Sequence, residues 1–134
     1  MLTSNFFLAV SAYILFNFAF AMLWNMVIFK KVYDKLTRGI AREKPIIPLG
    51  LLAIIVQGLS LAILFVLFFD GNNPVGTGLM FGLLIGSYSI AYGAFVVPAK
   101  FTVKPIRQYA LLELIYGVLH FGIAGIIMAL IFAA

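Results

Sequence analysis

The chain has no cysteine among its 134 residues and a single histidine, His120. The lack of cysteine excludes disulfides, thiolate nucleophiles, iron–sulfur ligation and Cys-x-x-Cys redox chemistry. One histidine without cysteine cannot build the usual zinc site, so no metal is expected. The sequence also lacks a phosphate-binding loop, a dinucleotide-binding fingerprint and a matched nucleophile, base and orienting acid. We therefore predict a protein that is not an enzyme.

Charge is scarce too. Charged residues make up 10% of the chain and hydrophobic residues 65%. A soluble domain carries about 25% charged and about 45–50% apolar residues. This composition predicts an integral membrane protein, with residues 1–134 forming a single transmembrane domain.

Four apolar stretches are long enough to cross a bilayer as helices, which takes about 20 residues each. They cover residues 5–29, 46–69, 75–99 and 108–132, with approximate boundaries. The expected fold class is an all-α integral membrane protein, a bundle of four transmembrane helices. Trp24, Tyr33 and Tyr109 lie near the ends of the helices and suit the aromatic belt at a membrane interface.

Positive charge is confined to two connections. All nine Lys and Arg residues lie within 30–45 and 100–107, which fall on the same side of a four-span protein. The positive-inside rule predicts that these two basic loops are cytoplasmic and that both termini lie outside. Topology and anionic lipids account for the net charge of +5, so no nucleic-acid partner is expected.

Glycines are concentrated on the last two stretches. Gly78, Gly82 and Gly86 recur at four-residue spacing in the third, and Gly117 and Gly125 lie in the fourth. Small residues on one face allow membrane helices to approach closely. We expect these two helices to pack through this face, a role in packing and not in activity.

Polar side chains fall at two depths when the helix rise of about 1.5 Å per residue is counted from the basic ends. The layer near the midplane comprises Asn17, Gln57, Ser87, Tyr88 and His120. The layer nearer the basic loops comprises Asn25, Tyr92 and Glu113. An unpartnered polar group in hydrocarbon costs several kcal/mol. We therefore expect these side chains to turn inward, toward one another.

Glu113, Tyr116 and His120 share one face of the fourth helix. An ionisable residue inside a membrane is a candidate functional residue, here for a proton-linked relay or a polar ligand site. The other interpretation is that Glu113 reaches the interface and His120 is a neutral hydrogen-bonding residue in the packing. The expected partners of Glu113 are Asn25 and Tyr92, or the cations Lys100, Lys104 and Arg107.

No cofactor is predicted, although a bound lipid or pigment stays open. His120 is the only candidate axial ligand for a haem or chlorophyll. An aromatic stripe on the first helix could line a pigment or quinone groove, but such stripes are more often packing faces. The stripe comprises Tyr13, Phe16, Phe20 and Trp24.

Two segments resemble small, uncharacterised four-span membrane protein families of bacteria, known as domains of unknown function. They are MLWNMVIFKKVYDKL at 22–36 and PIRQYALLELIYGVLHFGIAGIIMALIF at 105–132, together about a third of the chain. These families often have Asn or Asp where this chain has Glu113, and one related group has a Tyr-Asp pair where this chain has Tyr92 and Gly93. The resemblance implies a four-helix fold in the bacterial inner membrane and implies no activity.

These observations rank three functions, of which a membrane enzyme acting on lipid has the least support. The first is a non-catalytic protein that acts through helix packing, as an accessory subunit of a larger membrane complex or as a homo-oligomer. Its expected partners are membrane lipids, other integral membrane subunits or further copies of the chain. The alternative is a small proton-linked transporter or channel that uses Glu113 and His120.

Overall fold

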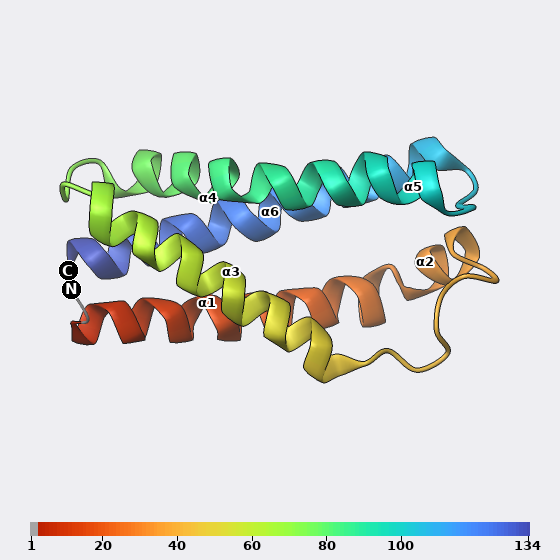
Figure 1. Cartoon of the computed structure of the whole chain (residues 1–134), viewed down its shortest axis with the longest axis horizontal. Coiled ribbons are helices and arrows are strands. Elements are labelled where there is room, and N and C mark those ends of the chain that lie inside the picture. The colour runs from red at the N-terminus through yellow and green to blue at the C-terminus, as the bar shows by residue number, and fades with distance from the viewer. Residues whose placement is uncertain (1–2) are drawn as a thin grey trace.

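The computed structural model describes residues 3–134, which form helices joined by short connections and contain no strand (Figure 1). In chain order the elements are α1 (Ser4–Met22), η1 (Leu23–Ile28), α2 (Lys30–Leu36), α3 (Ile47–Phe68), α4 (Pro74–Ala91), η2 (Tyr92–Val96), α5 (Val97–Lys100) and α6 (Ile106–Ala133). The segments η1 and η2 are π-helical and continue the helices before them.

Four continuous helical stretches are long and apolar enough to cross a membrane: Ser4–Ile28, Ile47–Phe68, Pro74–Lys100 and Ile106–Ala133. Their ends differ from the predicted spans by one or two residues. The prediction of an all-helical bundle of four apolar helices is confirmed. Figure 1 shows that α1 begins, and α6 ends, at the end of the bundle opposite α2 and α5.

The turn between α3 and α4 is held by its own polar side chains. Asn73 has a left-handed backbone (φ 42°) and caps α4 by accepting a hydrogen bond from the backbone N–H of Gly76 at 3.2 Å. The Asp70 carboxylate accepts hydrogen bonds from the backbone and side chain of Asn72, and these hold its pKa below the usual value. Asn and Asp are suited to such turns because their short side chains bond the nearby backbone.

The most extensive interface in the bundle lies between α4 and α6, where the two backbones meet at glycines. A Cβ on Gly125 would overlap the carbonyl oxygen of Gly78 and lie 2.9 Å from the Cα of Gly82. Gly86 lies against the ring of Phe121. Since the atoms in the way at Gly125 are backbone atoms, they cannot move aside without separating the helices.

The remaining helices pack less evenly. The helix α1 lies against both α6 and α3, whereas α3 makes few contacts with α4 and α6. Figure 1 shows α3 crossing the front of the bundle diagonally, beside α4 at one end and nearer α1 at the other. The main core lies toward the α3–α4 turn and includes Phe6, Tyr13, Leu61, Phe65 and Met128.

A smaller core closes the end with the basic loops. Leu36 of α2 packs there with Val103 and Tyr109. The first long helix is interrupted by a bend at Phe29 (φ −109°, ψ 15°), and the chain turns there so that α2 packs against the end of the bundle. The buried side chain of Leu36 explains the turn, because it would otherwise be exposed to water.

Candidate functional site

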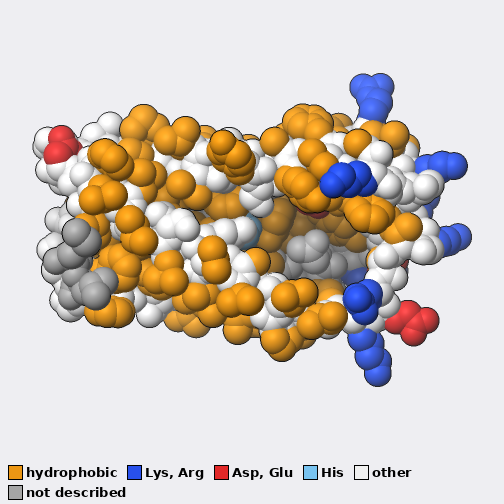
Figure 2. Space-filling model, viewed as in Figure 1, with side chains coloured by type: hydrophobic (Ala, Val, Ile, Leu, Met, Phe, Trp, Pro, Cys, Tyr) orange, Lys and Arg blue, Asp and Glu red, His pale blue; other side chains and the backbone are white. Residues whose placement is uncertain are grey.

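A cavity of about 380 Å³ lies between the two cores, in the half of the bundle near the basic loops. Figure 2 shows the surface hollowed at this place, beside the Lys and Arg side chains. Most of the lining is apolar. Six lining residues carry polar groups: Asn25, Gln57, Ser89, Glu113, Tyr116 and His120.

The cavity exists because the first turns of α3 diverge from α4 and α6. Pro45, Ile46 and Gly50 line it at this end. A Cβ added to Gly50 would meet no atom within 4 Å, so no neighbouring helix fills the space in front of it. The opening therefore follows from the tilt of α3.

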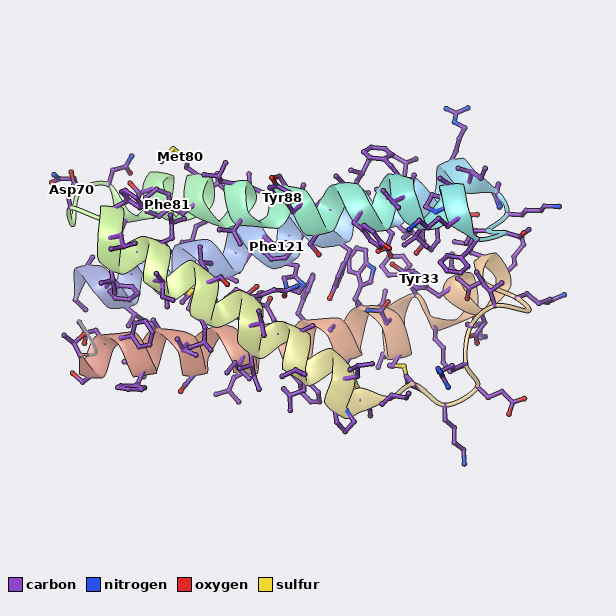
Figure 3. The ribbon with its side chains drawn as sticks, in the orientation of Figure 1. Tyr33, Asp70, Met80, Phe81, Tyr88 and Phe121 are labelled. Carbon is purple, nitrogen blue, oxygen red and sulfur yellow. The ribbon has the colours of Figure 1, made fainter. Side chains whose placement is uncertain are left out.

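Glu113 is held by a chain of hydrogen bonds from three elements. The hydroxyl of Tyr33 in α2 donates to Glu113 Oε1 at 2.7 Å, and Trp24 Nε1 in η1 donates to the Tyr33 oxygen at 3.1 Å. Tyr33 lies where α2 approaches the bundle (Figure 3). Burial and the nearby carboxylate raise the pKa of Tyr33 above its usual range, so its hydroxyl stays protonated and remains a donor.

The second carboxylate oxygen lies beside η2. A Cβ on Gly93 would lie 3.1 Å from Glu113 Oε2, tighter than an ordinary van der Waals contact. Both π-helical segments thus contribute to the surroundings of one carboxylate, η1 through Trp24 and η2 through Gly93. Such segments are frequent at functional sites because they displace side chains from regular helical positions.

The prediction of the hydrogen-bond and ion-pair partners of Glu113 is wrong. Asn25 donates instead to the carbonyl of Ala21 in its own helix at 3.0 Å. Tyr92 is exposed, with the Lys100 amine 5.7 Å from its ring centroid. Among residues 3–134 the one ion pair joins Lys30 and Asp34, so neither Lys100, Lys104 nor Arg107 pairs with the carboxylate.

His120 lines the cavity and is 5% exposed, yet neither ring nitrogen has a hydrogen-bond partner within the described chain. Aromatic rings surround it, with centroids 4.6 Å away at Phe121 and 5.1 Å away at Tyr116. Asn17 is 0% exposed, and its amide likewise has no partner. A buried polar group left unpaired costs about 1–3 kcal/mol.

The remaining residues of the two polar layers differ in whether they face the interior of the bundle or its surface. Gln57 of α3 accepts a hydrogen bond from the Tyr13 hydroxyl of α1 at 3.4 Å. Ser87, Tyr88 and Tyr92 lie on the exposed side of their helix, and Tyr88 is 88% exposed. The prediction that these three turn inward is wrong. The glycine face of α4 points at α6, and Tyr88, two positions after Gly86, points about 200° away from it.

Sequence reasoning placed Tyr33 in an interfacial belt and gave Gly93 no role in the site. The sequence carries no signal for either contact, because Tyr33 and Gly93 both lie far from Glu113 along the chain. The aromatic stripe of α1 faces the bundle interior, since Phe20 stacks on Tyr116 at 5.6 Å and Trp24 is buried.

No group of three or more metal-ligating side chains occurs within the described range 3–134. Comparison of the chain with models of protein families, with curated proteins and with solved structures found no match.

Proposed function

We propose that this protein is a small membrane transporter that binds a solute in the cavity and exchanges it for a proton at Glu113. The observation that carries the proposal is the convergence of six polar side chains on one cavity of about 380 Å³. Ligand sites in proteins are typically concave, about 300–1,000 Å³ in volume and mostly apolar, with a few polar groups that fix the orientation of the ligand.

The geometry of Glu113 suggests how a proton and a solute would compete. Tyr33 donates a hydrogen bond to Oε1, while Oε2 lies on the side of Gly93. A proton on the carboxyl group changes its charge and makes it a hydrogen-bond donor as well as an acceptor, so a solute bound to one form of the group loses its contacts with the other form. Proton and solute therefore exclude each other at one group, which is the coupling that an exchanger needs.

The orientation in the membrane belongs to this proposal. All nine Lys and Arg residues lie within 30–45 and 100–107, at the end of the bundle where the cavity opens, and Figure 2 shows Lys and Arg side chains gathered there. The positive-inside rule supports a cytoplasmic location for this end and an outside location for both termini. We propose the bacterial inner membrane as the location, on the resemblance of 22–36 and 105–132 to bacterial membrane families.

Flux measurements in proteoliposomes test the proposal. Liposomes that enclose the pH-sensitive dye pyranine are exposed in turn to gradients of benzyltrimethylammonium, benzenesulfonate and benzyl alcohol, which carry one positive charge, one negative charge and none. We expect one of these solutes to change the internal pH faster than in protein-free liposomes. Glu113→Gln should reduce this change to the protein-free rate, because the amide cannot exchange a proton.

Glu43→Gln is the matched control, since Glu43 is the other glutamate of the chain and lies exposed in the loop before α3. It should transport like the wild type. Wild-type protein that moves protons with none of the three solutes, or a Glu113→Gln variant that transports normally, would count against a proton-linked transporter.

A second role, packing against another membrane subunit or another copy of the chain, is supported by Tyr88. This side chain is 88% exposed on α4, and it lies near the middle of the apolar helical stretch Pro74–Lys100. A hydroxyl that faces hydrocarbon has no partner there, whereas a neighbouring helix could supply one. The proposed assembly is either a homo-oligomer or a complex in which this chain is an accessory subunit.

Native mass measurement of protein extracted in mild detergent tests this second role. We expect a stoichiometric complex for the wild type and dissociation for Tyr88→Leu. Leu84→Ala, on the same helix and also exposed, serves as the control. A wild-type protein that is monomeric and free of other subunits would reject the role in assembly and leave the transporter proposal unaffected.

A further inference from the structure

We infer that the cavity selects a monovalent organic cation with a small aromatic or other apolar group, bound with its charge at the Glu113 carboxylate. This inference rests on the proposed uptake of a solute and adds its chemical class. Glu113 is the only acidic residue that lines the cavity, and no Lys or Arg lines it. An anion would meet a carboxylate with no compensating cation, which makes it the least favoured class.

The walls of the cavity fit the apolar part of such a cation. Tyr116 follows Glu113 by three residues on the same face of α6, and its ring lines the cavity with those of Phe18 and Phe121. A cation over an aromatic face gains about 0.5–1 kcal/mol at exposed sites and about 2 kcal/mol when desolvated. Carboxylate and aromatic rings therefore favour the same sign of charge.

His120 gives the site a second polar end. It follows Glu113 by seven residues on α6, which corresponds to about 10 Å along the helix axis. The imidazole is 5% exposed, lines the cavity and has no hydrogen-bond partner in residues 3–134. A ligand that extends from Glu113 past Tyr116 would reach this imidazole, so a hydrogen-bonding group on its far end would be recognised there.

The basic residues at the rim do not cancel the negative charge inside. Arg42 lies beside the mouth of the cavity but belongs to the neighbouring shallow depression. Charges in water are screened over about 8 Å at physiological ionic strength. The basic residues at the rim thus slow the approach of a cation at low salt. The affinity for a cation inside the cavity depends on Glu113.

Trp24 provides a direct measure of binding, because it is the only tryptophan and its indole is joined to Glu113 through Tyr33. Benzyltrimethylammonium is titrated into the full chain in non-ionic detergent while Trp24 fluorescence is followed. We expect a saturable change, and no saturable change with benzenesulfonate or benzyl alcohol. Glu113→Gln should weaken binding of the cation at least tenfold, whereas Glu43→Gln should bind like the wild type.

A second variant keeps the test valid if Glu113→Gln does not fold. Gly93→Ala retains the carboxylate but places a methyl group beside Oε2, so it should also weaken binding of the cation. Equal binding of the cation by Glu113→Gln and the wild type would overturn the inference. So would binding of benzenesulfonate or benzyl alcohol as tight as that of the cation.

The pH dependence supplies an independent check. A proton on Glu113 competes with the cation, so binding should weaken as the pH falls. The titratable groups near this carboxylate are Tyr33 on α2 and Tyr109 and Tyr116 on α6, and His120 lines the same cavity. Protonated His120 would also repel a cation. His120→Gln should therefore retain a pH dependence, and a pH-independent affinity in this variant would overturn the role of Glu113.

The same cationic chemistry occurs in choline lipids. Binding is therefore compared in non-ionic detergent with and without added phosphatidylcholine. Equal affinity in the two identifies a free solute as the ligand, and weaker binding with phosphatidylcholine identifies a competing lipid headgroup. Cation binding without flux would reject the transporter and keep this inference, whereas flux driven by the anion or the neutral solute would do the reverse.

Discussion

Replacement of Gly125 by alanine is expected to lower the free energy of unfolding by about 3 kcal/mol, the upper part of the range for overpacked cores. The added Cβ would overlap the carbonyl oxygen of Gly78 and crowd the Cα of Gly82. Both are backbone atoms of α4, so the two helices must separate along their most extensive interface. Unfolding by SDS in mixed micelles, followed by circular dichroism, measures the loss.

Gly122→Ala is the matched control on the same helix. A Cβ there would lie 3.1 Å from Leu79 Cδ1, the far end of a flexible side chain, and would meet no backbone. Its effect should be within about 1 kcal/mol of the wild type, since alanine also favours the helix relative to glycine by about that amount. Equal losses for the two variants would show that backbone contact at Gly125 does not determine stability.

Replacement of Tyr33 by phenylalanine should lower the stability by about 2 kcal/mol, the range for hydrogen bonds to charged groups. The change removes the donor to Glu113 Oε1 and the acceptor of the Trp24 indole, while the ring itself is retained. Trp24 fluorescence should change in the folded variant, because the indole loses its partner. The same SDS unfolding experiment gives the free energy.

Tyr109→Phe controls for the loss of a hydroxyl in the same cluster. The Tyr109 ring lies edge-on to Tyr33 with centroids 6.5 Å apart, but its hydroxyl is not part of the chain that holds Glu113. We expect its stability and its Trp24 fluorescence to be close to those of the wild type. Losses of the same size in both variants would contradict a specific role for the Trp24–Tyr33–Glu113 chain.

Alkaline pH should separate Tyr33→Phe from the wild type in a second way. Burial raises the pKa of Tyr33 in the folded protein, whereas an unfolded tyrosine ionises near pH 10. Above that pH the folded state binds more protons than the unfolded state, so stability falls as the pH rises. Tyr33→Phe lacks this contribution, and its stability should decrease less steeply between pH 9 and 11.

The four apolar helices could be predicted because length and hydropathy are local properties of the sequence, and the ends of all four spans lie close to those expected. Which face of each helix is buried is not a local property of the sequence, because it depends on the neighbouring helices. Depth counting grouped Ser87 and Tyr88 with the interior, although the spacing of Gly82 and Gly86 directs the opposite face of α4 toward α6.

The hydrogen bond from Tyr33 to Glu113 could not be predicted from the sequence for a similar reason. Tyr33 reaches the carboxylate because the helix bends at Phe29 and α2 packs against the end of the bundle. No residue type at 29 marks such a bend. The cavity depends in turn on the tilt of α3, which is set by its contacts with α1 and not by its own hydrophobic pattern.

The uneven packing of α3 has a mechanical consequence. The pair α4–α6 is locked by glycine contacts between backbones, whereas α3 is held mainly by α1 and follows the ten-residue connection 37–46. A substitution that alters the α1–α3 contact would therefore change the shape of the cavity and leave the α4–α6 pair intact. Gln57 is the lining residue of α3 whose polar group would be displaced by such a change.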